Sequence, residues 1–256
     1  MVSDILVVQS WFGAKLSWIE CCLASVEGWA GAAGACYLRL DDALFDPLPG
    51  WAHDAARGAR LALTDYARLL WLRRLLGAAE RVIWLDADVL VFDPAGLVFP
   101  DAPFALARER WIWREAGTVR AEERVSNAAM LFSRAGGLLD WYVAACETIL
   151  RDAPRPLNRT ALGPQLLTAL QAQRPVPLID SIATLSPAVM ADLLAGGGEA
   201  LADHQAHWPA RVAAAHLCRS LGGTTDAPHL VDESVQRAVV ERLLTGGPAL
   251  LGACAR

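Results

Sequence analysis

The stretch Arg81–Phe92, RVIWLDADVLVF, contains the features that decide the fold of this chain. Its first part, Val82–Leu85, is a continuous apolar run, which is typical of a β-strand buried on both faces. Asp86 and Asp88 follow directly and mark the carboxyl end of this strand, because aspartate is disfavoured inside strands. In open α/β sheets, ligands bind at that end of the strands. The stretch therefore predicts a buried strand that leads into a ligand site.

The two aspartates are spaced for binding a metal ion. On an extended chain, the carboxylates of Asp86 and Asp88 point the same way because they lie two residues apart. Neighbouring carboxylates repel each other, and a bound divalent cation removes that repulsion. Mg²⁺ and Mn²⁺ bind carboxylates together with phosphate oxygens, so we expect one of these ions here. The alternative is a solvated turn that contains two acids.

Outward from this stretch, segments with strand and helix patterns alternate. Strands are predicted at residues 4–9, 35–40, 126–132 and 175–182, helices at 15–27, 64–77, 138–150 and 162–171, and a loop at 41–50. In the helix at 64–77, Thr64 is expected to be the N-cap and Gly77 to end the helix. This alternation predicts an α/β fold with a mostly parallel sheet flanked by helices.

The last part of the chain is amphipathic, with residues such as Val239 and Leu243 spaced for one face of a helix. Its polar face carries charges of both signs, which favours docking on the protein core over binding to a membrane. We therefore expect one main domain at residues 1–230 and a helical tail at residues 231–256 that packs on the same domain.

Composition restricts the classes of function and location. The 256 residues carry 23 Lys and Arg against 28 Asp and Glu, and the net charge of −5 argues against an extended nucleic-acid surface. No apolar run reaches the roughly 20 residues of a membrane-spanning helix. The start of the chain lacks the basic segment that opens a signal peptide. With six cysteines and no C-x-x-C pair, we expect a cytoplasmic protein with reduced, buried thiols.

Three classes of enzyme use an Asp-x-Asp motif after a strand. A phosphatase of the haloacid-dehalogenase type would use Asp86 as nucleophile and normally needs a downstream lysine, but Lys15 is the only lysine and lies upstream. Nucleotidylyltransferases generally have a glycine-rich loop after the first strand, and Gln9–Leu16 (QSWFGAKL) has no glycine cluster. Glycosyltransferases of the GT-A fold place the motif deep in the chain and require no lysine. Position and composition favour this third class.

The chain also resembles one family of such enzymes, the Asp-x-Asp glycosyltransferases related to capsular-polysaccharide and initiating α-mannosyltransferases. The similar segments are, in order, Gln9–Gly13 (QSWFG), Thr64–Arg68 (TDYAR), Asp86–Asp88 (DAD), Ser126–Met130 (SNAAM) and Gly163–Thr168 (GPQLLT). One departure precedes the Asp-x-Asp motif, where this chain has AERVIW at residues 79–84 and the family often has Gly-Gly-x-Tyr.

The resemblance implies a GT-A (Rossmann-like) fold and a retaining transfer of a hexose from a UDP- or GDP-sugar to a hydroxyl acceptor, dependent on Mn²⁺ or Mg²⁺. It implies that Asp88 binds the metal directly and that Asp86 reaches the ribose or a metal-bound water. Asp65 and Arg68 would lie near the nucleotide, with an ion pair on a helix surface as the alternative.

The resemblance further implies that Gln9 and Trp11 line the nucleotide slot, with core packing as the alternative for Trp11. GT-A enzymes often supply a histidine near the C-terminus to the same metal. Here His216 follows a run of small residues and is the candidate for that ligand, with a buried core histidine as the alternative. A zinc set could also be formed by His204, His207, His216 and Cys218, but the spacing is irregular.

Asn127 and Gln165 are expected at the sugar, because an amide side chain both donates to and accepts from hydroxyl groups, and Gln165 would face the anomeric carbon. The resemblance further implies that Gly163 is a substrate-binding residue. Trp111 and Trp113 are expected in an arginine-rich loop over the acceptor, with a half-buried strand as the alternative. The rival functions are the Asp86 phosphatase and a nucleotide-sugar-binding protein without catalytic activity.

Overall fold

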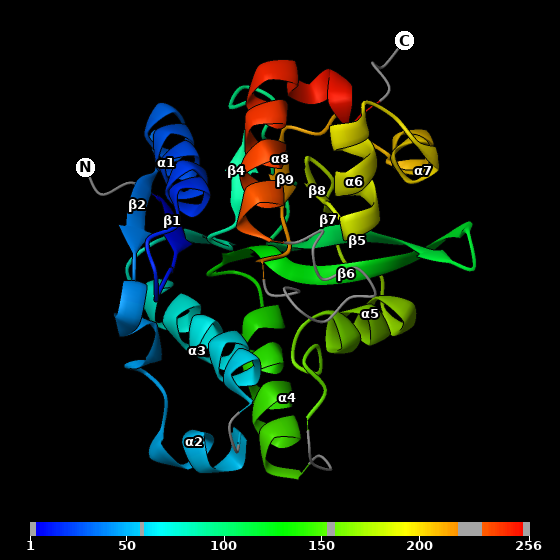
Figure 1. Ribbon diagram of the computed structural model, residues 1–256. Coiled ribbons are helices and arrows are strands. Elements are labelled where there is room, and N and C mark those ends of the chain that lie inside the picture. Colours follow the sequence, from blue (N-terminus) through cyan, green and yellow to red (C-terminus); the bar gives the residue numbers. More distant parts are fainter. Residues whose placement is uncertain (1–3, 57–58, 153–156, 220–231, 253–256) are drawn as a thin grey trace.

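The main sheet of the computed structural model has the strand order β2-β1-β3-β6-β5-β7 (Figure 1). The structure describes residues 4–56, 59–152, 157–219 and 232–252. The strands of this sheet are β1 (Ile5–Gln9), β2 (Cys36–Arg39), β3 (Arg81–Leu85), β5 (Phe104–Glu115), β6 (Thr118–Ser133) and β7 (Leu178–Ile179). Strand β1 pairs in parallel with β2 and β3, β7 pairs in parallel with β5, and β6 is antiparallel to both of its neighbours. The prediction of a mostly parallel α/β sheet is confirmed.

Helices cover both faces of this sheet because its strands are apolar on both sides. In β1, Val7 and Val8 point to opposite faces, and neither is exposed to solvent. One layer contains α2 (Gly50–Ala56), α3 (Arg60–Leu75), α4 (Leu138–Asp152) and α5 (Pro164–Gln173). The other contains α1 (Ser17–Ala32), α6 (Pro187–Ala195), α7 (Glu199–His207) and α8 (Glu233–Gly246), as Figure 1 shows.

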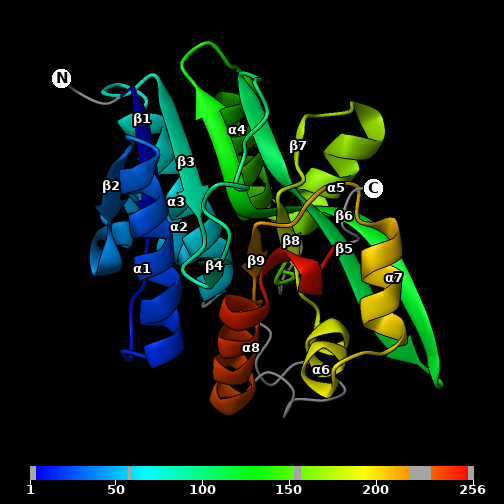
Figure 2. The same cartoon turned by 90° about the horizontal axis from the view of Figure 1, so that it is seen from above.

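A second sheet of three short strands positions part of the functional site. Its strands are β4 (Val89–Val91), β8 (Ile182–Thr184) and β9 (Ala214–His216), in the order β4-β9-β8. Figure 2 shows this small sheet beside α8, over the middle of the main sheet. Strand β9 pairs antiparallel with β4, so that His216 lies opposite Val89, the residue after Asp88. This pairing joins the Asp-x-Asp turn to a segment far away in the sequence.

The prediction of an arginine-rich loop around Trp111 and Trp113 is wrong, and the alternative of a half-buried strand is confirmed, because both residues are partly buried within strand β5. Strands β5 and β6 form a long hairpin whose two-residue turn, Ala116 and Gly117, has positive φ at both positions (48° and 81°). Such a turn matches the twist of the flanking strands. The turn was missed because alanine, unlike asparagine or aspartate, is an unusual residue at its first position.

Other predicted boundaries also change. Thr64 does not cap α3, because this helix begins at Arg60 and the Thr64 hydroxyl donates to the Arg60 carbonyl oxygen at 3.0 Å. The predicted loop at 41–50 contains the short 3-10 helix η1 (Asp41–Phe45) and runs into α2. The predicted strand at 175–182 is two short strands, β7 and β8, in different sheets.

The C-terminal helix α8 packs on the rest of the fold. Its buried residues Val239, Val240 and Leu243 belong to the same apolar cluster as side chains from α1 and α6, and the short 3-10 helix η4 (Gly247–Leu250) follows. The expected boundary between residues 230 and 231 lies outside the described residues. Among the described residues, no helix has the length and apolar character needed to cross a membrane. The five described cysteines are free thiols, and Cys36 is exposed, against the expectation that they are buried.

Candidate active site

A cavity of about 530 Å³ lies where the sequence predicted a ligand site, at the carboxyl ends of β1 and β3. One part of its wall contains apolar side chains from the segment that follows β1, from η1 and from the start of α3. Another part comes from the β5–β6 hairpin, the segment before α5 and the residues after β9. The Asp86–Asp88 turn also lines the cavity. The cavity therefore joins apolar, acidic and basic surfaces around the Asp-x-Asp motif.

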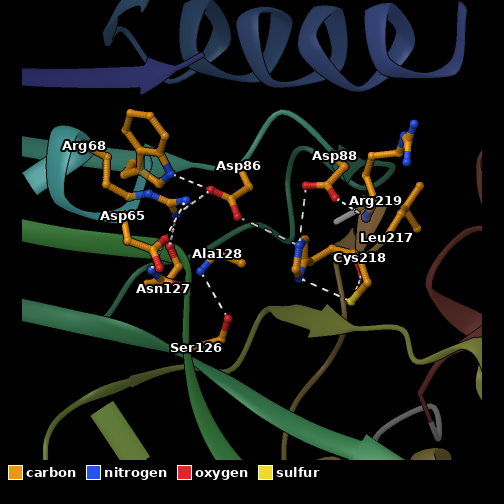
Figure 3. A network of polar contacts seen from close by, with 12 residues as sticks. Asp65, Arg68, Asp86, Asp88, Ser126, Asn127, Ala128, Leu217, Cys218 and Arg219 are labelled. Carbon is orange, nitrogen blue, oxygen red and sulfur yellow. Dashed lines mark hydrogen bonds and ion pairs between the residues drawn. The ribbon is translucent and has the colours of Figure 1, made fainter. Parts of the chain in front are cut away.

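Asp86, Asp88 and His216 all line this cavity. Figure 3 shows Asp86 and Asp88 in one network of polar contacts. One potential ligand atom of each of the three residues lies within 4.8 Å of the others, and His216 Nε2 is 3.4 Å from Asp88 Oδ1 and 3.9 Å from Asp86 Oδ2. Within the described part of the chain, this is the one group of three or more such residues. Two carboxylates and an imidazole are a donor set that suits Mn²⁺. The two neighbouring carboxylates repel each other, and a bound cation would remove that repulsion.

Main-chain contacts fix this arrangement. The Leu217 N–H donates to the Asp88 carbonyl oxygen at 3.0 Å, and the Arg219 N–H donates to Asp88 Oδ2 at 2.6 Å. The segment after β9 therefore holds both the backbone and the side chain of Asp88, beside His216 from the same segment.

The protonation of the cluster is strongly perturbed. Burial raises the pKa of Asp86, with Arg68 opposing that effect. Burial would also raise the pKa of Asp88, but His216 and the Arg219 N–H lower it below its usual value. Burial disfavours the cationic form of His216, yet Cys218 and Asp88 raise its pKa well above the usual range. These directions favour a protonated His216 beside the two carboxylates in the absence of an ion, and a divalent ion bound by His216 would displace that proton.

Arg68 connects Asp65 to Asp86 inside the protein. Its Nη1 lies 2.8 Å from Asp86 Oδ1 and 3.1 Å from the Asn127 carbonyl oxygen, and its Nη2 lies 3.0 Å from Asp65 Oδ1. The Trp84 indole N–H donates to the same Asp86 oxygen at 2.7 Å. The ion pair of Asp65 and Arg68 is therefore buried, not on a helix surface as in the alternative interpretation. Arg68 orients the Asp86 carboxylate.

The structure gives Gln9 a different place from the one expected. Gln9 is fully buried and does not line the cavity; its side-chain N–H donates to the Asp86 carbonyl oxygen at 3.1 Å. Its own side-chain oxygen accepts from the Tyr37 hydroxyl at 3.0 Å. Because β1 and β3 are neighbours, Gln9 can reach the end of β3 and hold the Asp-x-Asp turn. Trp11, in contrast, lines the cavity.

The other three residues expected to bind the substrate also differ in whether they line the cavity. Asn127 lines the cavity, and its amide N–H donates to Asp65 Oδ1 at 2.9 Å. Gly163 is buried behind Asn127, since a Cβ at Gly163 would lie 2.8 Å from Asn127 Oδ1. Gln165 is exposed near the start of α5 and lies outside the cavity lining. The structure therefore places Gln165 outside the cavity that Asn127 lines.

The alternative zinc set is not assembled. His204 is buried and stacks on Trp208 with a ring separation of 4.9 Å, whereas His207 is exposed and lies beside Asp203. Neither belongs to the metal-binding group defined above. Cys218 lies near that group, with its Sγ 3.7 Å from His216 Nδ1.

Several residues that line the cavity are not among the predicted site residues. Glu109 and Ser126 come from the hairpin and are buried, while Arg124, from the same hairpin, and Arg219 are more exposed. The signal available for Glu109 was its place between Arg108 and Arg110 in FALARERW, because alternation along a strand puts it on the face opposite the two arginines. The arginines carry no comparable signal, since the chain contains many.

No protein-family model and no curated protein matches this chain. Similar solved structures include a glycosyltransferase involved in the glycosylation of the major capsid of PBCV-1, with 12% identity, 92% of this chain and 98% of that chain covered, and a TM-score of 0.48. A second is the galactosyltransferase LgtC in complex with donor and acceptor sugar analogs, with 16% identity, 92% and 95% covered, and a TM-score of 0.48. A third is mouse xyloside xylosyltransferase 1, with 15% identity, 83% and 97% covered, and a TM-score of 0.46. At such values the likenesses assign neither substrate nor mechanism to this chain.

Proposed function

We propose that this chain is a metal-dependent glycosyltransferase of the GT-A type. The reaction would transfer a hexose from a UDP- or GDP-sugar to a hydroxyl acceptor with retention of configuration. One observation carries the proposal: Asp86, Asp88 and His216 converge on a cavity with an aromatic wall at the carboxyl ends of the strands. Retention and the hexose rest on the family resemblance of the sequence.

The metal group fits the chemistry of a leaving nucleoside diphosphate. An Mn²⁺ or Mg²⁺ ion held by Asp86, Asp88 and His216 would offset the negative charge that develops on the diphosphate as the sugar departs. Arg124 and Arg219 line the same cavity, and guanidinium groups are good partners for phosphate oxygens. Arg68, Trp84 and Gln9 would keep Asp86 in position for this task.

An apolar wall beside the metal group suits the nucleotide base. It contains the aromatic rings of Trp11 and Phe12 together with Leu44 and Leu61. Trp11 is anchored by its indole N–H, which donates to the Ala14 carbonyl oxygen at 2.9 Å. Aromatic faces bind any base by stacking, so this wall supports a nucleotide without choosing between uracil and guanine.

The structure does not favour the rival phosphatase. Asp86 would be the nucleophile, yet its Oδ1 already accepts from Arg68 and from Trp84. Lys15, the only lysine in the chain, is exposed and lies outside the cavity lining. We therefore propose the transferase alone. A nucleotide-sugar-binding protein without catalytic activity would use the same site, so a turnover assay distinguishes it from the transferase.

Nucleotide binding with and without metal tests the proposed site. Titration calorimetry with UDP and with GDP should show binding to the wild type in Mn²⁺ and none in EDTA. Asp88→Asn should weaken the Mn²⁺-dependent binding by more than about tenfold. Asp101→Asn, at a carboxylate that is 98% exposed, is the matched control and should bind like the wild type. Equal binding in Mn²⁺ and EDTA would contradict the metal-dependent site.

A further inference from the structure

Glu109 is a buried carboxylate in the cavity wall that belongs neither to the proposed metal group nor to the residues that hold Asp86 in position. It lies in β5, it is 5% exposed, and it lines the same cavity as Asp86, Asp88 and His216. Burying a charged carboxylate is costly unless it is well paired. The position of Glu109 therefore requires an explanation.

The direction of Glu109 follows from the alternation of side chains along β5. Arg108 and Arg110 turn away from the cavity, toward Asp180 and Asp203, with Arg108 Nε 2.8 Å from Asp180 Oδ1 and Arg110 Nε 2.8 Å from Asp203 Oδ1. Glu109 points to the opposite face of the strand, together with Trp111, and both line the cavity. The hairpin thus presents a carboxylate and an indole side by side to any ligand.

The partners of Glu109 leave part of its carboxylate free for a ligand. Arg124, across the hairpin, approaches Glu109 Oε1 only to 3.9 Å and donates through two other nitrogens to Glu122. Ser126 supplies a hydrogen bond from its side chain. A carboxylate has about four acceptor positions, so acceptor capacity remains on the side of the cavity. Burial raises the pKa of Glu109, and His216 and Arg124 oppose that effect.

We propose that Glu109 is the catalytic carboxylate that takes the proton from the attacking hydroxyl group; this rests on the proposed function. The hydroxyl oxygen approaches the anomeric carbon of the donor sugar on the face from which the diphosphate leaves, so that the configuration is retained, and it forms a bond to that carbon. The bond from that carbon to the diphosphate oxygen breaks, and its electron pair leaves with the diphosphate. The hydroxyl proton passes to a carboxylate oxygen of Glu109. The indole of Trp111 beside it offers an apolar face for the ring of the acceptor.

Donor hydrolysis tests this role without a known acceptor, because water then supplies the hydroxyl group. Glu109→Gln keeps the size of the side chain and removes the base, and Glu115→Gln is the matched control on the same hairpin, with a side chain that is 65% exposed. Nucleotide release from UDP- and GDP-sugars in Mn²⁺ should fall about 100-fold or more in Glu109→Gln and less than twofold in Glu115→Gln. UDP or GDP binding in Mn²⁺ should stay within twofold of the wild type in both variants.

Three results would overturn the proposal. The first is nucleotide release by Glu109→Gln within threefold of the wild type. The second is a loss of nucleotide binding in Glu109→Gln that accompanies the loss of release. The third is a wild type that binds nucleotide with Mn²⁺ but hydrolyses no donor. In the last case, Glu109 would fail to activate even water. A wild type that binds no nucleotide with Mn²⁺ would instead contradict the proposed function itself.

Discussion

Arg68 and Asp86 form a buried ion pair that ties helix α3 to the end of strand β3, with Arg68 Nη1 2.8 Å from Asp86 Oδ1 (Figure 3). The same guanidinium group lies 3.0 Å from Asp65 Oδ1. A single arginine thus lies between two carboxylates, one of which belongs to the group formed by Asp86, Asp88 and His216. Through this pair, the stability of the fold and the geometry of the site depend on the same side chain.

Replacing Arg68 should therefore reduce both stability and metal binding. In Arg68→Met, the buried Asp65 and the partly buried Asp86 lose their cation, and removal of one partner of a buried pair costs about 3–5 kcal/mol. Urea denaturation should show this loss in the free energy of unfolding, and Mn²⁺ should bind more weakly. Arg73→Met, at an exposed position of α3, is the control. A loss below about 1 kcal/mol would show that Arg68 does not hold the two acids together.

The close approach of Gly163 to Asn127 makes a second prediction. A Cβ at position 163 would lie 2.8 Å from Asn127 Oδ1 and 2.9 Å from its Nδ2. Gly163→Ala should push the Asn127 amide away from Asp65, cost about 1–3 kcal/mol and reduce donor turnover. Gly137→Ala is the control, because no atom lies within 4 Å of the added methyl group. Wild-type turnover in Gly163→Ala would mean that the position of Asn127 does not matter for the site.

The buried His204 predicts a loss of stability in acid. Burial lowers its pKa to about 4, and Arg110 adds to this effect. The unfolded chain binds a proton at this histidine near pH 6.5, whereas the folded chain does so only near pH 4. The unfolded state is therefore favoured as the pH falls through this window, by up to about 3 kcal/mol.

His204→Phe should remove that part of the pH dependence, as measured by denaturant unfolding at pH 7, 6, 5 and 4. His207→Phe, three residues along the same helix and largely exposed, should leave the pH dependence unchanged. If His204→Phe loses as much stability between pH 7 and pH 4 as the wild type, His204 is not the group responsible.

The sequence predicted the parts of the site that lie close together along the chain. An apolar strand followed by Asp86 and Asp88 implied a metal site at a strand end, and the structure places both residues in the group with His216. His216 itself was identified only through the family resemblance. Its place opposite Val89 depends on the pairing of β9 with β4, two segments far apart in the chain. Local pattern contains no information about such a pairing.

The functions of individual polar residues were harder to predict. Gln9 follows an apolar run just as a ligand-binding residue would, yet it is buried and bonds to the Asp86 carbonyl oxygen. Gln165 lies near a helix start, as predicted, but the orientation of α5 leaves it exposed. Glu109 was missed because the hairpin turn at Ala116 was not recognised. In each case the direction of a side chain follows from packing between elements, which the periodicity of one segment does not specify.

Acceptor-free release of nucleotide from a panel of UDP-, GDP- and dTDP-sugars tests the central claim most directly. We expect the wild type to release nucleotide from one donor in Mn²⁺, with no release in EDTA and none in Asp88→Asn, while Asp101→Asn behaves like the wild type. Release that continues in EDTA, or that survives in Asp88→Asn, would contradict a metal-dependent transferase built on Asp86, Asp88 and His216.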